Sequence, residues 1–138
     1  MKKYFLILVM IFLIGNAVNA QVSIIVNKSV SETSISAATL GNIYSLVETK
    51  WNNGSRIVVF DYNSDNTLKS SFYKHISKDA LSIKKEWMRK QLTGEAKAPQ
   101  LFSSDDEVLA KVASTPGAIG YVKSSIVNSS VKVVVEIK

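Results

Sequence analysis

The stretch from residue 57 to residue 69 constrains the fold most strongly. Ile57 to Phe60 is continuously apolar, as in strands that are covered on both faces, which is the usual state of a strand in a parallel sheet. The polar turn DYNSDN follows directly, and Leu68, Phe72 and Ile76 then recur at the spacing of one helix face. A buried strand that leads through a short turn into a helix indicates an α/β fold.

The rest of the chain continues this alternation of strands and helices. The runs VSIIVN, AIGYV and VKVVVEI predict strands at residues 22–27, 118–122 and 131–137. Further helices are predicted to begin at Ser36, Asp79 and Ser104, which are all good N-cap residues. Residues 95–103 are predicted to form a loop. This order predicts the α/β class, with a single three-layer lobe in which a mixed, mostly parallel sheet is flanked by helices.

Apolar spacing also predicts which side of each element faces the core. The helix after Ser36 should bury Leu40, Ile43, Tyr44 and Val47. The helix after Asp79 has Leu81, Met88 and Leu92 on one side, with Ile83 and Trp87 beside them. The last strand should turn one face inward, made of Val131, Val133, Val135 and Ile137.

Residues 1–20 are expected to be a signal peptide. A short basic head, MKK, precedes an apolar run from Tyr4 to Ile14, and Val18 and Ala20 are small residues that fit a cleavage site after Ala20. The apolar run is too short for a spanning helix, which needs about 20 residues. An uncleaved anchor is the alternative. We therefore expect a periplasmic or secreted protein, without stable membrane insertion, whose residues 21–138 form a single domain.

Composition narrows the classes of partner. Without the two lysines of the head, the net charge of +6 becomes +4. We expect this charge to keep the surface soluble, with anionic solutes, lipid head groups or acidic partners as the alternatives, and nucleic acid is not expected in that compartment. The chain has no Cys, so its core forms without disulfides.

Several stretches together resemble the solute-binding proteins of phosphate ABC transporters. They are SIIVNKSV, LGNIYSLVETKWNNGSRI, EWMRKQLTG and, most specifically, STPGAIGYV, in the order of that family's second lobe. The resemblance implies a periplasmic-binding-protein-like lobe of type II, with Trp51 and Trp87 in packing positions. The chain departs from the family in two ways. It has residues for one lobe only, and the residues that hold phosphate in the family's second lobe are replaced.

The replaced phosphate-binding residues lie in the turn from Asp61 to Thr67. The family has an Arg, three residues and then Ser-Gly-Thr at a helix start, and this chain aligns Asp61, Asp65, Asn66 and Thr67 with those four positions. Asp65 is the expected N-cap, whose carboxylate would occupy the place of the anion. Two carboxylates in the turn would oppose a phosphate by several kcal/mol at an effective dielectric of about 20. The candidate ligand-binding residues are nonetheless Ser64, Asp65, Asn66 and Thr67.

Other chemistry has little support in the sequence. The turn lacks the spacing of a calcium loop, so no metal site is predicted. His75, the single histidine, lies on the apolar side of its helix, where a half-buried structural role is expected. No nucleophile elbow, P-loop or zinc motif is present, so no catalytic residue, cofactor or enzymatic activity is predicted. Lys84, Lys85, Arg89 and Lys90 give one helix a basic outer side, for which solvation is expected and docking onto anionic lipid or an acidic partner is the alternative.

Two functions remain open. In the first, the chain is an exported, non-enzymatic binding module related to phosphate-transport receptors that binds phosphate or another small anion weakly, alone or as a homodimer. In the second, it is an accessory protein-interaction module of the cell envelope whose ancestral phosphate site is defunct. The missing Arg and the missing lobe favour the second, because one lobe does not bury most of a ligand.

Overall fold

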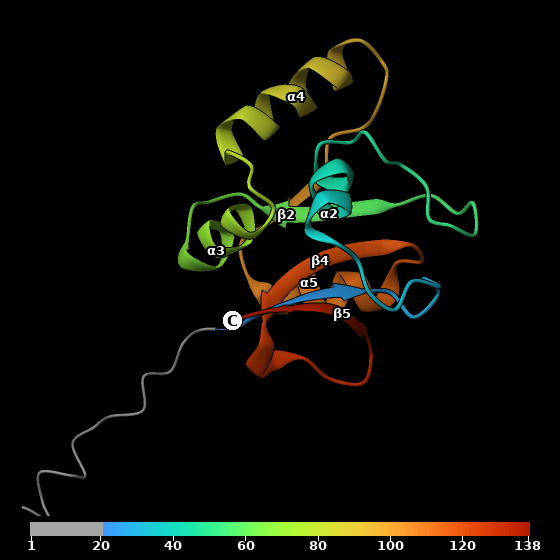
Figure 1. Ribbon diagram of the computed structural model, residues 1–138, viewed down its shortest axis with the longest axis vertical. Helices are drawn as coiled ribbons and strands as arrows, with labels where there is room; N and C mark the ends of the chain where they lie inside the picture. The colour runs from blue at the N-terminus through green and yellow to red at the C-terminus, as the bar shows by residue number, and fades with distance from the viewer. Residues whose placement is uncertain (1–20) are drawn as a thin grey trace, which may run out of the picture.

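The computed structural model describes residues 21–138, which form one mixed sheet flanked by helices (Figure 1). The sheet order is β3-β2-β4-β1-β5, and the strands are β1 (Val22–Val26), β2 (Val58–Tyr62), β3 (Gln100–Phe102), β4 (Ala118–Lys123) and β5 (Lys132–Ile137). β2 runs parallel to β3 and β4, whereas β1 is antiparallel to β4 and β5. The predicted fold class is confirmed. The predicted signal peptide and its cleavage site lie outside the described residues.

The helices start at side-chain caps. α2 (Ala37–Tyr44), α4 (Ala80–Leu92) and α5 (Asp105–Ser114) follow the predicted N-caps, each of which accepts a hydrogen bond from the backbone N–H three residues on. α3 (Thr67–His75) is capped by Asn66 instead of Asp65. A short 3₁₀ helix, η2 (Ser124–Ile126), joins β4 to the last strand. No helix among the described residues is long and apolar enough to cross a membrane.

The helices cover both faces of the sheet. Gly120 and Tyr121 are successive residues of β4 and therefore point to opposite faces. A Cβ on Gly120 would lie 2.7 Å from the side chain of Val108 on α5, whereas the ring of Tyr121 stacks on Phe72 of α3 with centroids 4.0 Å apart. The ring of Tyr44 on α2 lies 4.6 Å from that of Phe72. The layers are thus α5, the sheet, and α2 with α3.

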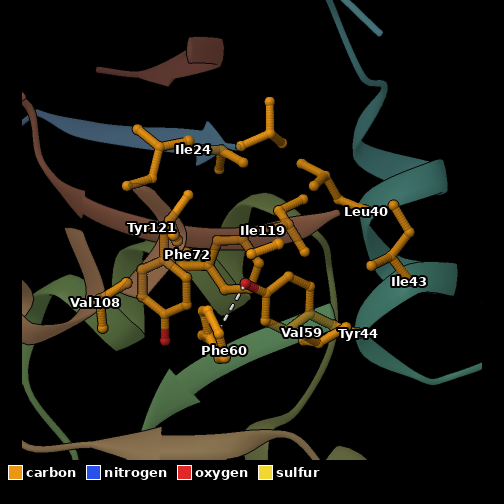
Figure 2. Close-up of a cluster of buried hydrophobic side chains, with 14 of the residues drawn as sticks. Ile24, Leu40, Ile43, Tyr44, Val59, Phe60, Phe72, Val108, Ile119 and Tyr121 are labelled. Carbon is orange, nitrogen blue, oxygen red and sulfur yellow. Dashed lines mark hydrogen bonds between the residues drawn. The ribbon is translucent and has the colours of Figure 1, made fainter. Parts of the chain in front are cut away.

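The core is an aromatic and aliphatic cluster around β4 (Figure 2). Several of its polar side-chain groups donate to backbone carbonyls: the Tyr44 hydroxyl donates to Phe60 O at 3.0 Å. Both tryptophans are buried and act in the same way, since Trp51 Nε1 donates to Gly117 O at 2.9 Å and Trp87 Nε1 donates to Tyr44 O at 2.6 Å. Their predicted packing roles are confirmed.

Several predicted burial patterns are wrong. Val47 is 68% exposed, because α2 ends at Tyr44 and Leu46 takes a left-handed conformation (φ 60°) that turns the chain away from the helix path. On α4 the core takes Ile83, Trp87 and Lys90, which leaves the other apolar residues outside: Leu81, Met88 and Leu92 are exposed. Lys90 is therefore not part of the basic outer side.

Two further corrections concern the sheet. The predicted loop at residues 95–103 contains β3, which is too short to show a pattern in sequence. In β5 the register slips opposite Ile24 and Ile25, so that Val134 is an extra residue in the ladder. The buried valines of this segment are consequently Val131 and Val134 instead of a strictly alternating set.

Candidate functional site

A pocket of about 390 Å³ lies at the carboxyl ends of β2 and β4. The starts of α3 and α5 form its sides, and the antiparallel strand β1 begins beside it. Its lining consists of Val22, Tyr62, Asn66, Thr67, Leu68, Ser71, Ser103, Ser104, Asp105 and Lys123. The carboxyl ends of strands are where open α/β sheets bind ligands, so this pocket is the candidate binding site.

The start of α3 brings backbone donors to the pocket. The Asn66 side chain accepts a hydrogen bond from Lys69 N at 2.7 Å, and Asn66 O accepts one from Ser70 N at 3.0 Å. A helix leaves its first N–H groups without intrahelical partners, and here these belong to Thr67 and Leu68, which both line the pocket. Free N–H groups and the helix dipole favour an anion at this position.

The structure separates the four predicted ligand-binding residues. Asn66 and Thr67 line the pocket, whereas Ser64 and Asp65 lie in the exposed turn outside its lining. The Asp65 side chain is 95% exposed and lies 3.8 Å from the Lys69 ammonium. The predicted cap at Asp65 is therefore wrong, because Asn66 takes the N-cap position one residue later, and the Asp65 carboxylate does not fill the place of an anion.

Asp61 is turned away from the pocket and into the core, where it is fully buried. Its carboxylate accepts hydrogen bonds from the hydroxyls of Tyr121 and Tyr73, both at 2.5 Å, and from Tyr62 N at 2.7 Å. Burial raises the pKa of Asp61, and the hydrogen bonds from Tyr121 and Tyr73 oppose that rise. Of the two carboxylates that were expected to repel a phosphate, that of Asp61 is therefore buried and only that of Asp65 is open to solvent.

The start of α5 brings a capped helix N-terminus and one carboxylate to the pocket. Ser104 accepts a hydrogen bond from Glu107 N at 3.3 Å, and the Glu107 carboxylate lies 3.1 Å from the Ser104 hydroxyl. Asp105 lines the pocket, and its Oδ2 atom is buried without a hydrogen-bond partner among the described residues. Burial, followed by the charge of Asp105, raises the pKa of Tyr62, another lining residue.

Sequence reasoning missed the α5 side of this pocket. Asp105 was interpretable only as a favourable first-turn acid, and nothing in the sequence places Ser103 or Lys123 near Thr67. The one usable signal was the predicted alternation of strands and helices, since turns that follow parallel strands lie at the same edge of a sheet. The strand β3, which pairs in parallel with β2 and brings the start of α5 beside the start of α3, was not predicted.

Other candidate chemistry lies away from this pocket. His75 is half-buried in the last turn of α3 and does not line the pocket. Within residues 21–138, no group of three or more His, Asp or Glu side chains is arranged to hold a metal ion.

Comparison with known proteins identifies the fold. No family model matches the chain, and no curated protein matches it. Among solved structures, a protein from Clostridium perfringens named as a phosphate ABC transporter substrate-binding protein, with bound phosphate, matches with a TM-score of 0.68 at 20% identity. PstS from Borrelia burgdorferi matches with a TM-score of 0.62, and an ABC-type phosphate transport receptor from Vibrio cholerae with 0.61, both at 19% identity.

These matches cover most of this chain and a minor part of the others. Each covers 83% of this chain but only 45%, 47% and 46% of the Clostridium, Borrelia and Vibrio proteins. The chain thus spans less than half the length of the structures that it matches. The resemblance predicted from the sequence is confirmed for the fold: the chain has the architecture of phosphate ABC transporter substrate-binding proteins over less than half of their length.

Proposed function

We propose that this chain is a non-enzymatic binding module that holds a small oxyanion, foremost hydrogen phosphate, in the pocket between α3 and α5. The observation that carries the proposal is the meeting of two helix starts at the carboxyl ends of β2 and β4. The same fold occurs in proteins named for phosphate binding, one of them solved with phosphate bound.

The lining matches the chemistry of a protonated oxyanion. Free N–H groups at Thr67 and Leu68, the hydroxyl of Ser71 and the Lys123 ammonium are donors for its oxygens. The Ser103 hydroxyl already donates to the Glu107 carboxylate at 2.9 Å. The buried Oδ2 of Asp105 needs a donor in return. Hydrogen phosphate supplies both kinds of group, whereas sulfate at neutral pH has no proton to donate.

The binding is expected to be weak. No Arg lines the pocket, so the bidentate, charge-assisted contact that Arg makes with phosphate is missing. The pocket also closes on the ligand from one side only, and well-bound ligands lose most of their exposed surface. We expect a dissociation constant on the order of 1 mM, equivalent to about −4 kcal/mol.

We also propose that the chain is exported, that it serves a transport system and that it forms a homodimer. We place this binding outside the cytoplasm, in the periplasm or the medium, because residues 1–20 have the pattern of a signal peptide. The second candidate function, an accessory interaction module of the cell envelope, is favoured by one observation: three large apolar side chains of α4, those of Leu81, Met88 and Leu92, are exposed.

The proposal is tested by thermal unfolding of residues 21–138 in increasing phosphate, with sulfate at matched ionic strength as the control. A ligand at ten times its dissociation constant adds about 1.4 kcal/mol of stability, a shift of several degrees for a domain of this size. We expect a larger shift with phosphate than with sulfate. Equal shifts with both anions, or none, contradict the proposal.

A pair of variants assigns the selectivity to one carboxylate. Asp105→Asn replaces the buried acceptor, so the difference between phosphate and sulfate should shrink or vanish. Asp106→Asn removes the same charge from the same helix turn, but Asp106 is exposed and lies outside the pocket lining. It should keep the difference. An equal loss of the difference in both variants would assign it to net charge, and a difference that persists in Asp105→Asn would show that Asp105 does not touch the ligand.

A further inference from the structure

α4 presents two opposite faces, and only one of them is used by the core. Ile83, Trp87 and Lys90 are buried. At about 100° per residue, Leu81, Met88 and Leu92 fall together on the side opposite to these residues, and they are 60%, 56% and 86% exposed. Figure 1 shows α4 at the periphery of the molecule, beyond α2 and β2. The exposed apolar row therefore has no counterpart within the described body.

Unpaired cations share this outer face. Lys84 and Lys85 lie between Leu81 and Met88 in the helix, are exposed, and take part in none of the ion pairs within residues 21–138. Arg89, in contrast, is paired with Glu86 at 3.0 Å and with Glu95 at 3.4 Å. The face is thus apolar along its centre and positive at its flanks.

The positive charge extends beyond α4. Residues 67–92 contain seven Lys or Arg and two Asp or Glu, whereas the rest of residues 21–138 contains eight and nine. Lys74 and Lys78, on and after α3, are exposed as well. The charge of the described body is therefore concentrated on α3 and α4, on one part of the molecule (Figure 1).

We propose that the outer face of α4 docks onto a membrane surface that contains anionic lipid. A helix with an apolar row and flanking lysines binds such a surface by placing the row at the level of the headgroups, while lysines attract the lipid charge. A second copy of the chain docked on this face would place its Lys84 and Lys85 against the same lysines, and the like charges would repel each other. A broad positive area suits a continuous anionic surface better than the localised ion pairs of a protein partner.

The mode of attachment of α4 fits this role. Trp87 Nε1 donates to Tyr44 O and Lys90 Nζ donates to Leu46 O at 2.8 Å, so two hydrogen bonds fix the inner face to the end of α2. The outer face takes no part in these contacts. Substitutions there leave the core unchanged, which makes the surface testable without unfolding the protein.

The test is co-sedimentation of residues 21–138, which contain every strand of the described sheet, with vesicles of phosphatidylcholine with or without phosphatidylglycerol. We expect binding to the anionic vesicles that weakens as salt is added. Lys84→Gln with Lys85→Gln should lower the partition coefficient about 30-fold. Exchanging Leu81 and Leu92 for Gln should lower it about tenfold or more.

The matched control exchanges two exposed lysines outside α3 and α4, Lys28 and Lys111, for Gln. This variant has the same net charge as the α4 pair and should keep most of the binding. An equal loss in both lysine pairs would overturn the proposal in favour of diffuse attraction. Absence of vesicle binding would overturn the proposal. If the protein then binds polyglutamate, and this binding is lost with the lysine exchanges but not with the leucine exchanges, the face docks an acidic protein partner instead.

Discussion

At the scale of single residues, Asp61 is the most unusual position in the molecule. Its carboxyl is buried beneath α3 and is held by two tyrosine hydroxyls and a backbone N–H. Burial of an ionised carboxylate costs free energy unless its hydrogen bonds are complete. Three donors make this site tolerable, and they tie together β2, β4 and α3 through one side chain.

Asp61 predicts a pH dependence of stability. Because burial raises its folded-state pKa above the ordinary value of about 3.9, the folded state keeps this proton at a pH where the unfolded chain has lost it. The stabilising contribution is fully present below about pH 4 and is lost as the pH rises through the raised pKa. In Asp61→Asn this loss should disappear, so the free energy of unfolding of the variant relative to the parent should rise with pH.

Urea unfolding at a series of pH values measures this difference. Asp65→Asn is the matched control, because it makes the same exchange four residues away, at a side chain that is 95% exposed. It should leave the pH profile of the parent nearly unchanged. Parallel profiles for the two variants would show that Asp61 titrates as an ordinary surface acid.

The same turn shows where residue-level prediction fails. Asp65 and Asn66 are neighbours, both are good N-caps, and only the path of the chain decides which of them is placed at the helix start. The chain enters that turn from Asp61, whose carboxylate accepts hydrogen bonds from tyrosines 12 and 60 residues away. Such distant partners leave no signal in the local sequence.

At the scale of elements, α5 packs closely on β4. An added Cβ at Gly120 would lie 2.7 Å from Val108 and 3.2 Å from Val112. Gly120→Ala should therefore overpack this interface and lower the free energy of unfolding by about 1–3 kcal/mol. Chemical denaturation measures the loss, and a second substitution, Val108→Ala, should recover part of it by removing the clashing methyl groups.

Gly41→Ala is the comparison that makes this prediction specific. Gly41 lies inside α2, and the nearest atom to an added Cβ is Cε of Lys78 at 3.3 Å, at the end of a flexible side chain. Alanine is also the better helix former by about 1 kcal/mol. Gly41→Ala should therefore be neutral or stabilising. A similar loss at both glycines would point to a backbone effect instead of overpacking.

Most elements were predictable from the sequence because their signals are local. The caps at Ser36, Asp79 and Ser104 mark three helix starts correctly. The end of α2, the strand β3 and the slip in β5 were not predictable, because each is decided by tertiary contacts. The burial pattern of α4 failed for another reason: its outer face is apolar, so periodicity indicated two inner faces where only one exists.

At the scale of the whole molecule, stability should be distributed unevenly. β1 is buried along its whole length and lies between β4 and β5. α4 is attached mainly by Ile83, Trp87 and Lys90. Amide hydrogen exchange should therefore be slowest in β1 and β4 and much faster in α4, which opens locally at a smaller free energy. Uniform exchange in all elements would contradict this order.

The candidate site was only partly predictable from the sequence. Its α3 side was predictable, since Asn66 and Thr67 lie in a turn after a buried strand. Its α5 side required knowing that the turn after β3 lies next to the turn after β2, which the parallel pairing of Tyr62 with Phe102 establishes. Pockets between elements are properties of topology, and sequence patterns describe elements one at a time.

The antiparallel position of β1 has a consequence for how this fold is joined to other chains. Val22 pairs with Ile137, so the described body is entered and left at neighbouring points on one side, as Figure 1 shows for the C-terminus and the start of β1. A body whose two ends are adjacent can be inserted into a surface loop of a host protein without stretching it. Val22 also lines the pocket, so a host joined in this way would stand beside the pocket mouth, and a fluorescent host would turn the domain into a sensor for its ligand.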